Sequence, residues 1–246
     1  MAMSVYGQGI LRLQARRHTT YRLGGTTLRR AAVLFIVSFV LIIFTAILFT
    51  NSLTVVQHVT RVSDVVGPVE IKGPGGSSFK AITGDASVQS GTVVRTGPKA
   101  SAVLSWADGT RMKADADTEL TIEKCRMNKR KKATTSLFSL NVGKIWVDVV
   151  GVLSSESKFE ISTPTVTAGV RGTTFSVEVA PTGETNVFVH EGTVAVAGGG
   201  PPIAVKAGSA ARVNSGGSVD VRGLTDVERT SVVEALEPAA KEDPAE

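Results

Sequence analysis

Two hydrophobic patterns follow one another along the chain. Residues Ala31 to Phe49 form a run of nineteen positions in which only Ser38 and Thr45 are polar. Further on, short stretches alternate apolar and polar residues, as in 175–179 (FSVEV), and no helix-period segment of useful length occurs between residues 63 and 222. Alternation with β-branched residues is typical of half-buried strands. The pattern predicts one apolar helix followed by an all-β body of about ten to fourteen short strands, arranged as a sandwich or a solenoid-like stack.

The apolar run has the length of a membrane span. At about 1.5 Å per residue, a helix of this length covers roughly 28 Å, close to the hydrocarbon thickness of a bilayer. We therefore expect a transmembrane signal-anchor over residues 31–50; a cleaved signal peptide and a buried core helix are the alternatives. The basic region is longer than that of a signal peptide, and no small-residue cleavage pattern follows the run.

Flanking cations predict the orientation of this helix. Only Arg61 lies in the twenty residues after the run, whereas six arginines precede it: Arg12, Arg16, Arg17, Arg22, Arg29 and Arg30. Because cytoplasmic flanks carry the excess of Lys and Arg, we expect an inner-membrane protein with its N-terminus in the cytoplasm. The C-terminal body is expected in the periplasm or outside the cell, and the bilayer is the first expected partner.

The end of the chain has a different pattern. Thr225-Asp-Val-Glu228 has the spacing of a helix capping box, and Pro238 ends the helical pattern. A short C-terminal helix is therefore expected. Together, the patterns predict a basic cytoplasmic arm, a membrane helix, a linker, an all-β domain, and a short helix with an acidic tail, at residues 1–30, 31–50, 51–62, 63–222 and 223–246.

The net charge is concentrated in one segment. The 246 residues carry 27 Lys and Arg against 22 Asp and Glu, but the six arginines before residue 31 have no acidic residue among them. The rest of the chain is close to neutral, so the sequence pI of about 9.5 belongs to the arm. This distribution argues against a nucleic-acid binder, whose basic surface would lie on the folded body.

Few residues are available for catalysis or metal binding. Cys125 is the single cysteine, so no intrachain disulfide is possible. Its neighbours Lys124 and Arg126 would favour a thiolate, but a small, half-buried residue at a strand end is the commoner outcome for such a position and is the interpretation we favour. His58 and His190 are the only histidines after the apolar run, too few for an ordinary zinc site. We expect no enzyme, no catalytic residue, no metal and no cofactor; a hydrolase that uses His190 or His58 is the weaker alternative.

One pair of motifs resembles a known family. Residues 160–179 read EISTPTVTAGVRGTTFSVEV, and residues 183–196 read GETNVFVHEGTVAV. This resembles the FecR-type domain over roughly residues 63–200, and the turn signatures within residues 91–122 resemble its upstream half. The residues that match the family motif are Thr163, Pro164, Gly169, Val170, Arg171, Gly172, Thr173, Phe175, Glu191 and Gly192.

The resemblance implies a function outside the cytoplasm. It suggests a non-catalytic binding, sensing or scaffolding module of the bacterial cell envelope, held by a single membrane anchor. The alternative is a transmembrane regulator of a cytoplasmic sigma-type transcription factor. The expected partners are an envelope protein or an anionic polymer, no nucleic acid is expected, and the oligomeric state is left open.

Arg171 is the informative residue of the motif. Gly169 and Gly172 flank it and permit a sharp backbone path. One interpretation is an internal staple, with the guanidinium buried against a carboxylate such as Asp148 or Glu160. The other is contact with a ligand or partner.

A basic stretch lies between two predicted strands. Six cations occur within nine residues: Lys124, Arg126, Lys129, Arg130, Lys131 and Lys132. The position predicts a hairpin-like connection. It is either a solvated loop or a surface that binds lipid headgroups, an envelope polymer or an acidic protein.

Overall fold

The computed structural model describes residues 25–52, 55–57, 60–130, 132–150 and 154–236. The chain divides into two compact units, one up to Thr50 and one from Asn51 onward. Helix α1 (Gly25–Ser52) contains the whole apolar run. Its described large hydrophobic side chains, from Val33 to Phe44, are 44–78% exposed. Within the described residues, the structure contains no helix whose length and hydropathy would together suffice for a bilayer crossing.

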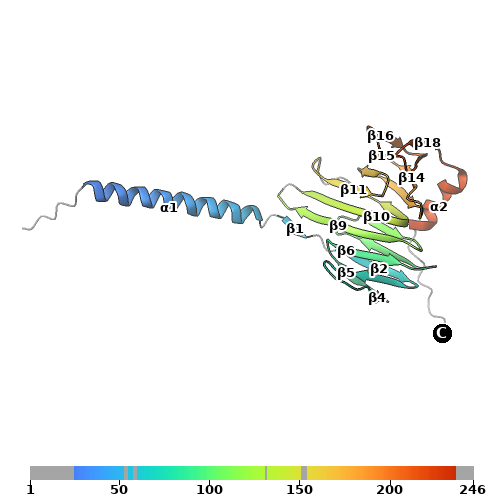
Figure 1. Cartoon of the computed structure of the whole chain (residues 1–246), viewed down its shortest axis with the longest axis horizontal. Coiled ribbons are helices and arrows are strands. Elements are labelled where there is room, and N and C mark those ends of the chain that lie inside the picture. Colours follow the sequence, from blue (N-terminus) through green and yellow to red (C-terminus); the bar gives the residue numbers. More distant parts are fainter. Residues whose placement is uncertain (1–24, 53–54, 58–59, 131, 151–153, 237–246) are drawn as a thin grey trace, which may run out of the picture. The chain divides into compact units, whose positions relative to one another are not determined.

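The second unit is built from strands and one short helix (Figure 1). The described strands are β1 (Val55–Gln57), β2 (Thr60–Val66), β3 (Val69–Lys72), β4 (Lys80–Ile82), β5 (Ala86–Val88), β6 (Thr92–Thr96), β7 (Ser101–Ser105), β8 (Arg111–Ala114), β9 (Glu119–Asn128), β10 (Ala133–Asp148), β11 (Lys158–Ser162), β12 (Thr167–Val170), β13 (Thr174–Val179), β14 (Thr185–Glu191), β15 (Thr193–Ala197), β16 (Ile203–Lys206), β17 (Ser209–Val213) and β18 (Val219–Gly223), followed by helix α2 (Asp226–Leu236).

The all-β prediction is confirmed, although the strands outnumber the expectation. Strands β1, β4 and β5 have only three residues each, too few for an alternating pattern to reveal. The segment expected to be a linker, residues 51–62, contains β1 and the beginning of β2. This segment belongs to the sheets because β1 pairs with β9, and β2 pairs with β5 and β7.

The strands form two sheets that pack face to face. The first sheet has the order β4-β3-β6-β9-β10-β11-β12-β15-β16, with β1 added beside the end of β9. The second has the order β5-β2-β7-β8-β10-β13-β14-β17-β18. Fully buried side chains from both sheets, such as Phe138, Leu104 and Phe175, form one core between them. The two sheets therefore enclose one core, and we call this two-sheet body the sandwich.

Strand β10 belongs to both sheets. Its residues up to Val142 pair with β9, and those from Gly143 onward pair with β8 and β13. At the change of sheet, Gly143 has φ +96°, and a Cβ there would overlap Thr118. The Thr118 hydroxyl accepts a 3.0 Å hydrogen bond from the Lys144 amide, which fixes the corner. Only glycine permits both this backbone conformation and this approach.

The same set of strand pairings occurs twice along the chain. The antiparallel pairs β3–β6, β6–β9, β7–β8, β8–β10 and β9–β10 have counterparts in β11–β12, β12–β15, β13–β14, β14–β17 and β15–β16. Strand β10 closes the first set and, through β13, begins the second. The two halves therefore share one strand and one core.

We predict that Gly143→Ala destabilises the second unit by at least about 3 kcal/mol, because the substitution adds both left-handed backbone strain and an overlap with Thr118. Thermal unfolding should show a midpoint lowered by roughly 10 °C. Gly84→Ala is the matched control, since its Cβ would meet no atom within 4 Å. Equal midpoints for the two variants would show that the corner does not constrain the fold.

Candidate functional site

The two halves of the family motif meet at one end of the sandwich. Residues 171–173 form the turn from β12 to β13, and Gly192 forms the turn from β14 to β15. Gly192 has φ +80°, and a Cβ there would lie 2.8 Å from the carbonyl oxygen of Gly172. Thr174 pairs with Glu191 just below these turns. We call residues 171–173 and 191–192 the motif end.

Most other motif residues stabilise the fold. Phe175 is fully buried in the core. The Thr163 hydroxyl lies 2.9 Å from the Thr185 hydroxyl and accepts a 3.1 Å hydrogen bond from the Val166 amide. Gly169 pairs with Ala195 across β12 and β15. These side chains join the second half of the sandwich and leave little surface for a partner.

Arg171 does not form the internal staple considered above. Its side chain is exposed, and it forms no ion pair with the described residues. Asp148 accepts a 3.2 Å hydrogen bond from the Thr174 hydroxyl instead, and Glu160 pairs with Lys158 at 2.9 Å. Asp148 has its partner on the neighbouring strand β13, and Glu160 has its partner two residues earlier on its own strand β11.

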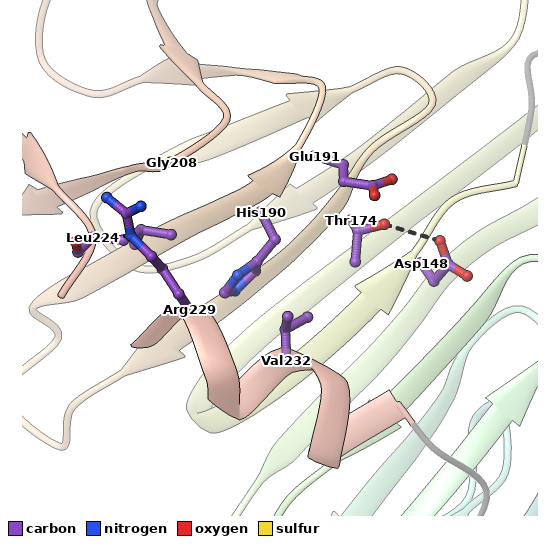
Figure 2. Close-up of a pocket in the computed structure, with 8 residues that line it drawn as sticks. All are labelled: Asp148, Thr174, His190, Glu191, Gly208, Leu224, Arg229 and Val232. Atoms are coloured by element: carbon purple, nitrogen blue, oxygen red, sulfur yellow. Dashed lines mark hydrogen bonds between the residues drawn. The ribbon is translucent and has the colours of Figure 1, made fainter. Parts of the chain in front are cut away.

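A second feature beside the motif end is a hollow of about 570 Å³ under α2. Figure 2 shows His190 pointing toward α2, which carries Arg229 and Val232, with Asp148 and Thr174 to one side. The hollow is lined by Asp148, Thr174, His190, Glu191, Gly208, Leu224, Arg229 and Val232. Beside the hollow, Phe188, Ala210 and Leu224 form a small apolar cluster separate from the main core.

His190 lines this hollow, and its surroundings disfavour the protonated imidazole. Burial, and then the charge of Lys144, lower the pKa of His190 below its usual value. Its ring lies 6.0 Å from the Trp146 ring, and Nε2 has no hydrogen-bond partner among the described residues. Asp148 is bonded to Thr174 and does not orient the imidazole. The arrangement can offer a hydrogen bond to a ligand, but it lacks the oriented base of a hydrolytic triad. His58 lies outside the described residues.

Cys125 is buried, and the reactive-thiolate interpretation is wrong. Its side chain is fully covered. Burial raises the pKa of the Cys125 thiol, which lies against Trp106, Thr60 and Ser136. The flanking cations point elsewhere because adjacent strand residues face opposite sides of a sheet. Within the described part of the chain, no three His, Cys, Asp or Glu side chains are grouped for a metal ion.

The basic stretch forms the predicted hairpin connection. Asn128 pairs with Ala133 where β9 turns into β10. We call its five described cations, Lys124, Arg126, Lys129, Arg130 and Lys132, the basic hairpin tip. Lys124 is half-buried and the other four are exposed. Lys131 lies outside the described residues.

The motif end and the basic hairpin tip lie at the same end of the sandwich. A crevice of about 20 Å³ between them is lined by residues of both neighbourhoods, including Thr134 from the start of β10, Lys158 and Arg171. The sequence did not indicate this proximity, because residues 124–132 and Arg171 lie in different predicted connections that are far apart along the chain.

Helix α2 begins with the predicted capping box. The Thr225 amide donates to a Glu228 carboxylate oxygen at 2.8 Å, and the Glu228 amide donates to the Thr225 hydroxyl at 3.3 Å. Arg222 forms a bidentate pair with the same carboxylate, at 2.6 and 2.9 Å. The hydrogen bond from Arg222 holds the pKa of Glu228 at about 2. This pair joins β18 to α2 and therefore positions the helix over the hollow.

One comparison, with known protein families, agrees with the motif. The family described as "FecR protein" matches residues 92–195. No curated protein matches the chain. Two crystal structures of a candidate anti-sigma factor from Parabacteroides distasonis ATCC 8503 are similar, with 17% and 16% sequence identity and TM-scores of 0.47. The match covers 57% of this chain and 63% and 64% of those chains, so it spans less than two thirds of their length.

We predict that Glu228→Gln loosens α2 by about 1 kcal/mol at neutral pH, because the amide keeps the cap but loses the charge pair with Arg222. The folded-state pKa of Glu228 lies below its ordinary value of 4.5. The stabilisation is therefore complete above about pH 4.5 and is lost as the pH falls toward 2. Hydrogen exchange of the α2 amides should show a difference from wild type at pH 7 that disappears near pH 2.

Glu184→Gln is the control for this prediction. It removes an ion pair with Arg212, at 2.8 Å, that caps no helix. Exchange in α2 should remain at the wild-type rate. A difference between wild type and Glu228→Gln that persists unchanged at pH 2 would contradict the assignment.

Proposed function

This chain carries a FecR-type domain, and we propose that it is a non-catalytic, membrane-anchored module that binds a protein of the bacterial cell envelope through the motif end. The single observation that carries the proposal is Arg171. It is the cation of the motif and is exposed, although Thr173 and Phe175 close to it are buried, and no described residue neutralises it.

The geometry of the motif end suits a protein partner. A guanidinium offers five hydrogen-bond donors in a fixed plane and can bind one carboxylate through two parallel hydrogen bonds. Glu191 lies on the adjoining turn and is also exposed, so the motif end presents both signs of charge. The two turns abut through Gly192 and Gly172, which holds their side chains in a fixed relation. The expected partner surface therefore carries at least one carboxylate opposite Arg171.

The anchoring part of the proposal rests on the first unit. Helix α1 has an uninterrupted apolar run, and its described large side chains are exposed. A helix that is hydrophobic on all sides is typical of a buried core or of a membrane span. The arginines that precede the run favour a cytoplasmic N-terminus and an extracytoplasmic FecR-type domain.

A second candidate function is regulation of a cytoplasmic sigma-type factor, which the family match supports as a regulatory role. It would require residues 1–30 to bind that factor. The six arginines and the lack of acidic residues in this arm favour an acidic protein surface as its target.

We predict that external protease degrades the second unit in intact spheroplasts. If Ala31 to Phe49 span the membrane with the N-terminus inside, residues 51–246 are accessible and a tag at the N-terminus is protected. Immunoblotting of both ends checks this. A second unit that is cleaved only after lysis would contradict the proposed orientation.

We predict that Arg171→Gln lowers the yield of partner crosslinking about tenfold or more, because a desolvated charge pair at an interface is lost. The measurement is photocrosslinking of the full chain in its membrane from a probe at the exposed Thr193. Thermal unfolding should change by less than about 0.5 kcal/mol, as for an ordinary surface substitution.

Lys80→Gln is the matched control, since it also removes an exposed cation from the second unit, on the edge strand β4 and away from the motif end. It should crosslink as wild type does. An Arg171→Gln variant that melts early and retains its crosslinks would assign Arg171 to the fold. Crosslinks found only from residues 1–30 to a cytoplasmic transcription factor would favour the second candidate function.

A further inference from the structure

We propose that the basic hairpin tip binds the headgroups of anionic phospholipids on the membrane surface next to the anchor. This inference rests on the anchoring part of the proposed function and adds a second, peripheral contact with the same membrane. The motif end does not supply this contact.

The basic hairpin tip extends beyond β6, the strand that pairs with the first residues of β9. Strand β6 pairs with β9 only as far as Ile122, and β1 pairs with residues Arg126 to Asn128 instead. Lys129, Arg130 and Lys132 follow in the exposed turn. The cations are therefore presented on a narrow, strand-supported projection.

Among the described residues, no carboxylate forms an ion pair with the cations of the tip. None of its five cations forms an ion pair with the described residues, whereas Arg61, Arg95, Arg212 and Arg222 are each paired with a carboxylate. Two acidic residues lie on the same strand. Glu119 is held by Arg95, and Glu123 is exposed just before the tip. The five cations thus form a patch that no carboxylate of the described residues pairs with, and a ligand with anionic groups could supply the counter-charge.

Chain connectivity links this patch to the anchor. Strand β1 begins at Val55, six residues after Phe49, the last residue of the apolar run. Six residues span at most about 20 Å. Because β1 pairs with the tip itself, a bilayer that holds the apolar run keeps its surface within reach of the tip. A soluble polymer or an acidic protein would gain nothing from this linkage, so the observations favour lipid.

The expected strength follows from the number of cations. Each Lys or Arg near an anionic bilayer surface adds about fivefold to association, and the attraction falls off within a Debye length of about 10 Å. Five cations therefore bind cooperatively in low salt and release in high salt. Phosphate groups of the headgroups would accept hydrogen bonds from Arg126 and Arg130 and neutralise the three lysines.

The test uses the full chain in nanodiscs of phosphatidylcholine, alone or with about one third phosphatidylglycerol, and measures hydrogen exchange of amides 128–132. We expect exchange at the tip to slow about tenfold in the anionic discs at low salt, and this protection to disappear near 1 M salt. Lys124/Arg126/Lys129/Arg130→Gln should abolish the protection, while Lys80→Gln, which removes an exposed cation on β4, should retain it.

Each other outcome has a definite meaning. Equal exchange in neutral and anionic discs, or protection that survives in the quadruple variant, would overturn the lipid proposal. Soluble poly-glutamate is added to the neutral discs as a further arm of the experiment. If it protects the tip as well as phosphatidylglycerol does, the ligand of the tip is an acidic polymer and not a lipid. A chain that does not enter nanodiscs at all would instead refute the anchor, which is a failure of the proposed function.

Discussion

The arrangement of this protein depends on one strand that changes sheets. Strand β10 pairs with β9 up to Val142 and with β8 and β13 from Gly143 onward. Because the strand turns back at Gly143, its first and last residues lie at the same end of the sandwich. Ala133 there pairs with the hairpin tip, and Asp148 pairs with Thr174 below the motif end. The corner thus brings together the two surfaces on which the proposals rest.

Local features of the fold could be predicted from the sequence because they depend on local rules. Alternation in residues 175–179 predicted β13, and the spacing of Thr225 and Glu228 predicted the start of α2. The twofold set of pairings was not predictable, because equivalent strands have different lengths and few identical residues. The apolar stretch 137–150 also gave no sign that its strand crosses between sheets at Gly143, since both parts are hydrophobic.

The candidate site could be predicted only in part, because its turns follow local rules whereas the environment of Arg171 depends on the tertiary structure. The glycines of the motif indicated tight turns, and the structure confirms a positive φ at Gly172 and Gly192. The environment of Arg171 depends on which carboxylates lie nearby and on what else they bind. Asp148 is bonded to Thr174 and Glu160 is paired with Lys158, so neither is available to Arg171. Spacing along the chain contains no information on such competition between partners.

The positive charge of the hairpin tip is compatible with the orientation proposed for the anchor. The rule that places cations in the cytoplasm applies to residues close to the membrane helix, and long domains cross the membrane largely regardless of their charge. Lys124 lies 75 positions after Phe49 and would not influence insertion. The cations at the end of β9 come beside β1, which follows α1 in the sequence, only after folding. Insertion would thus be directed by the arginines of the arm, and the cations of the tip could act on the opposite surface of the bilayer once the sandwich has formed.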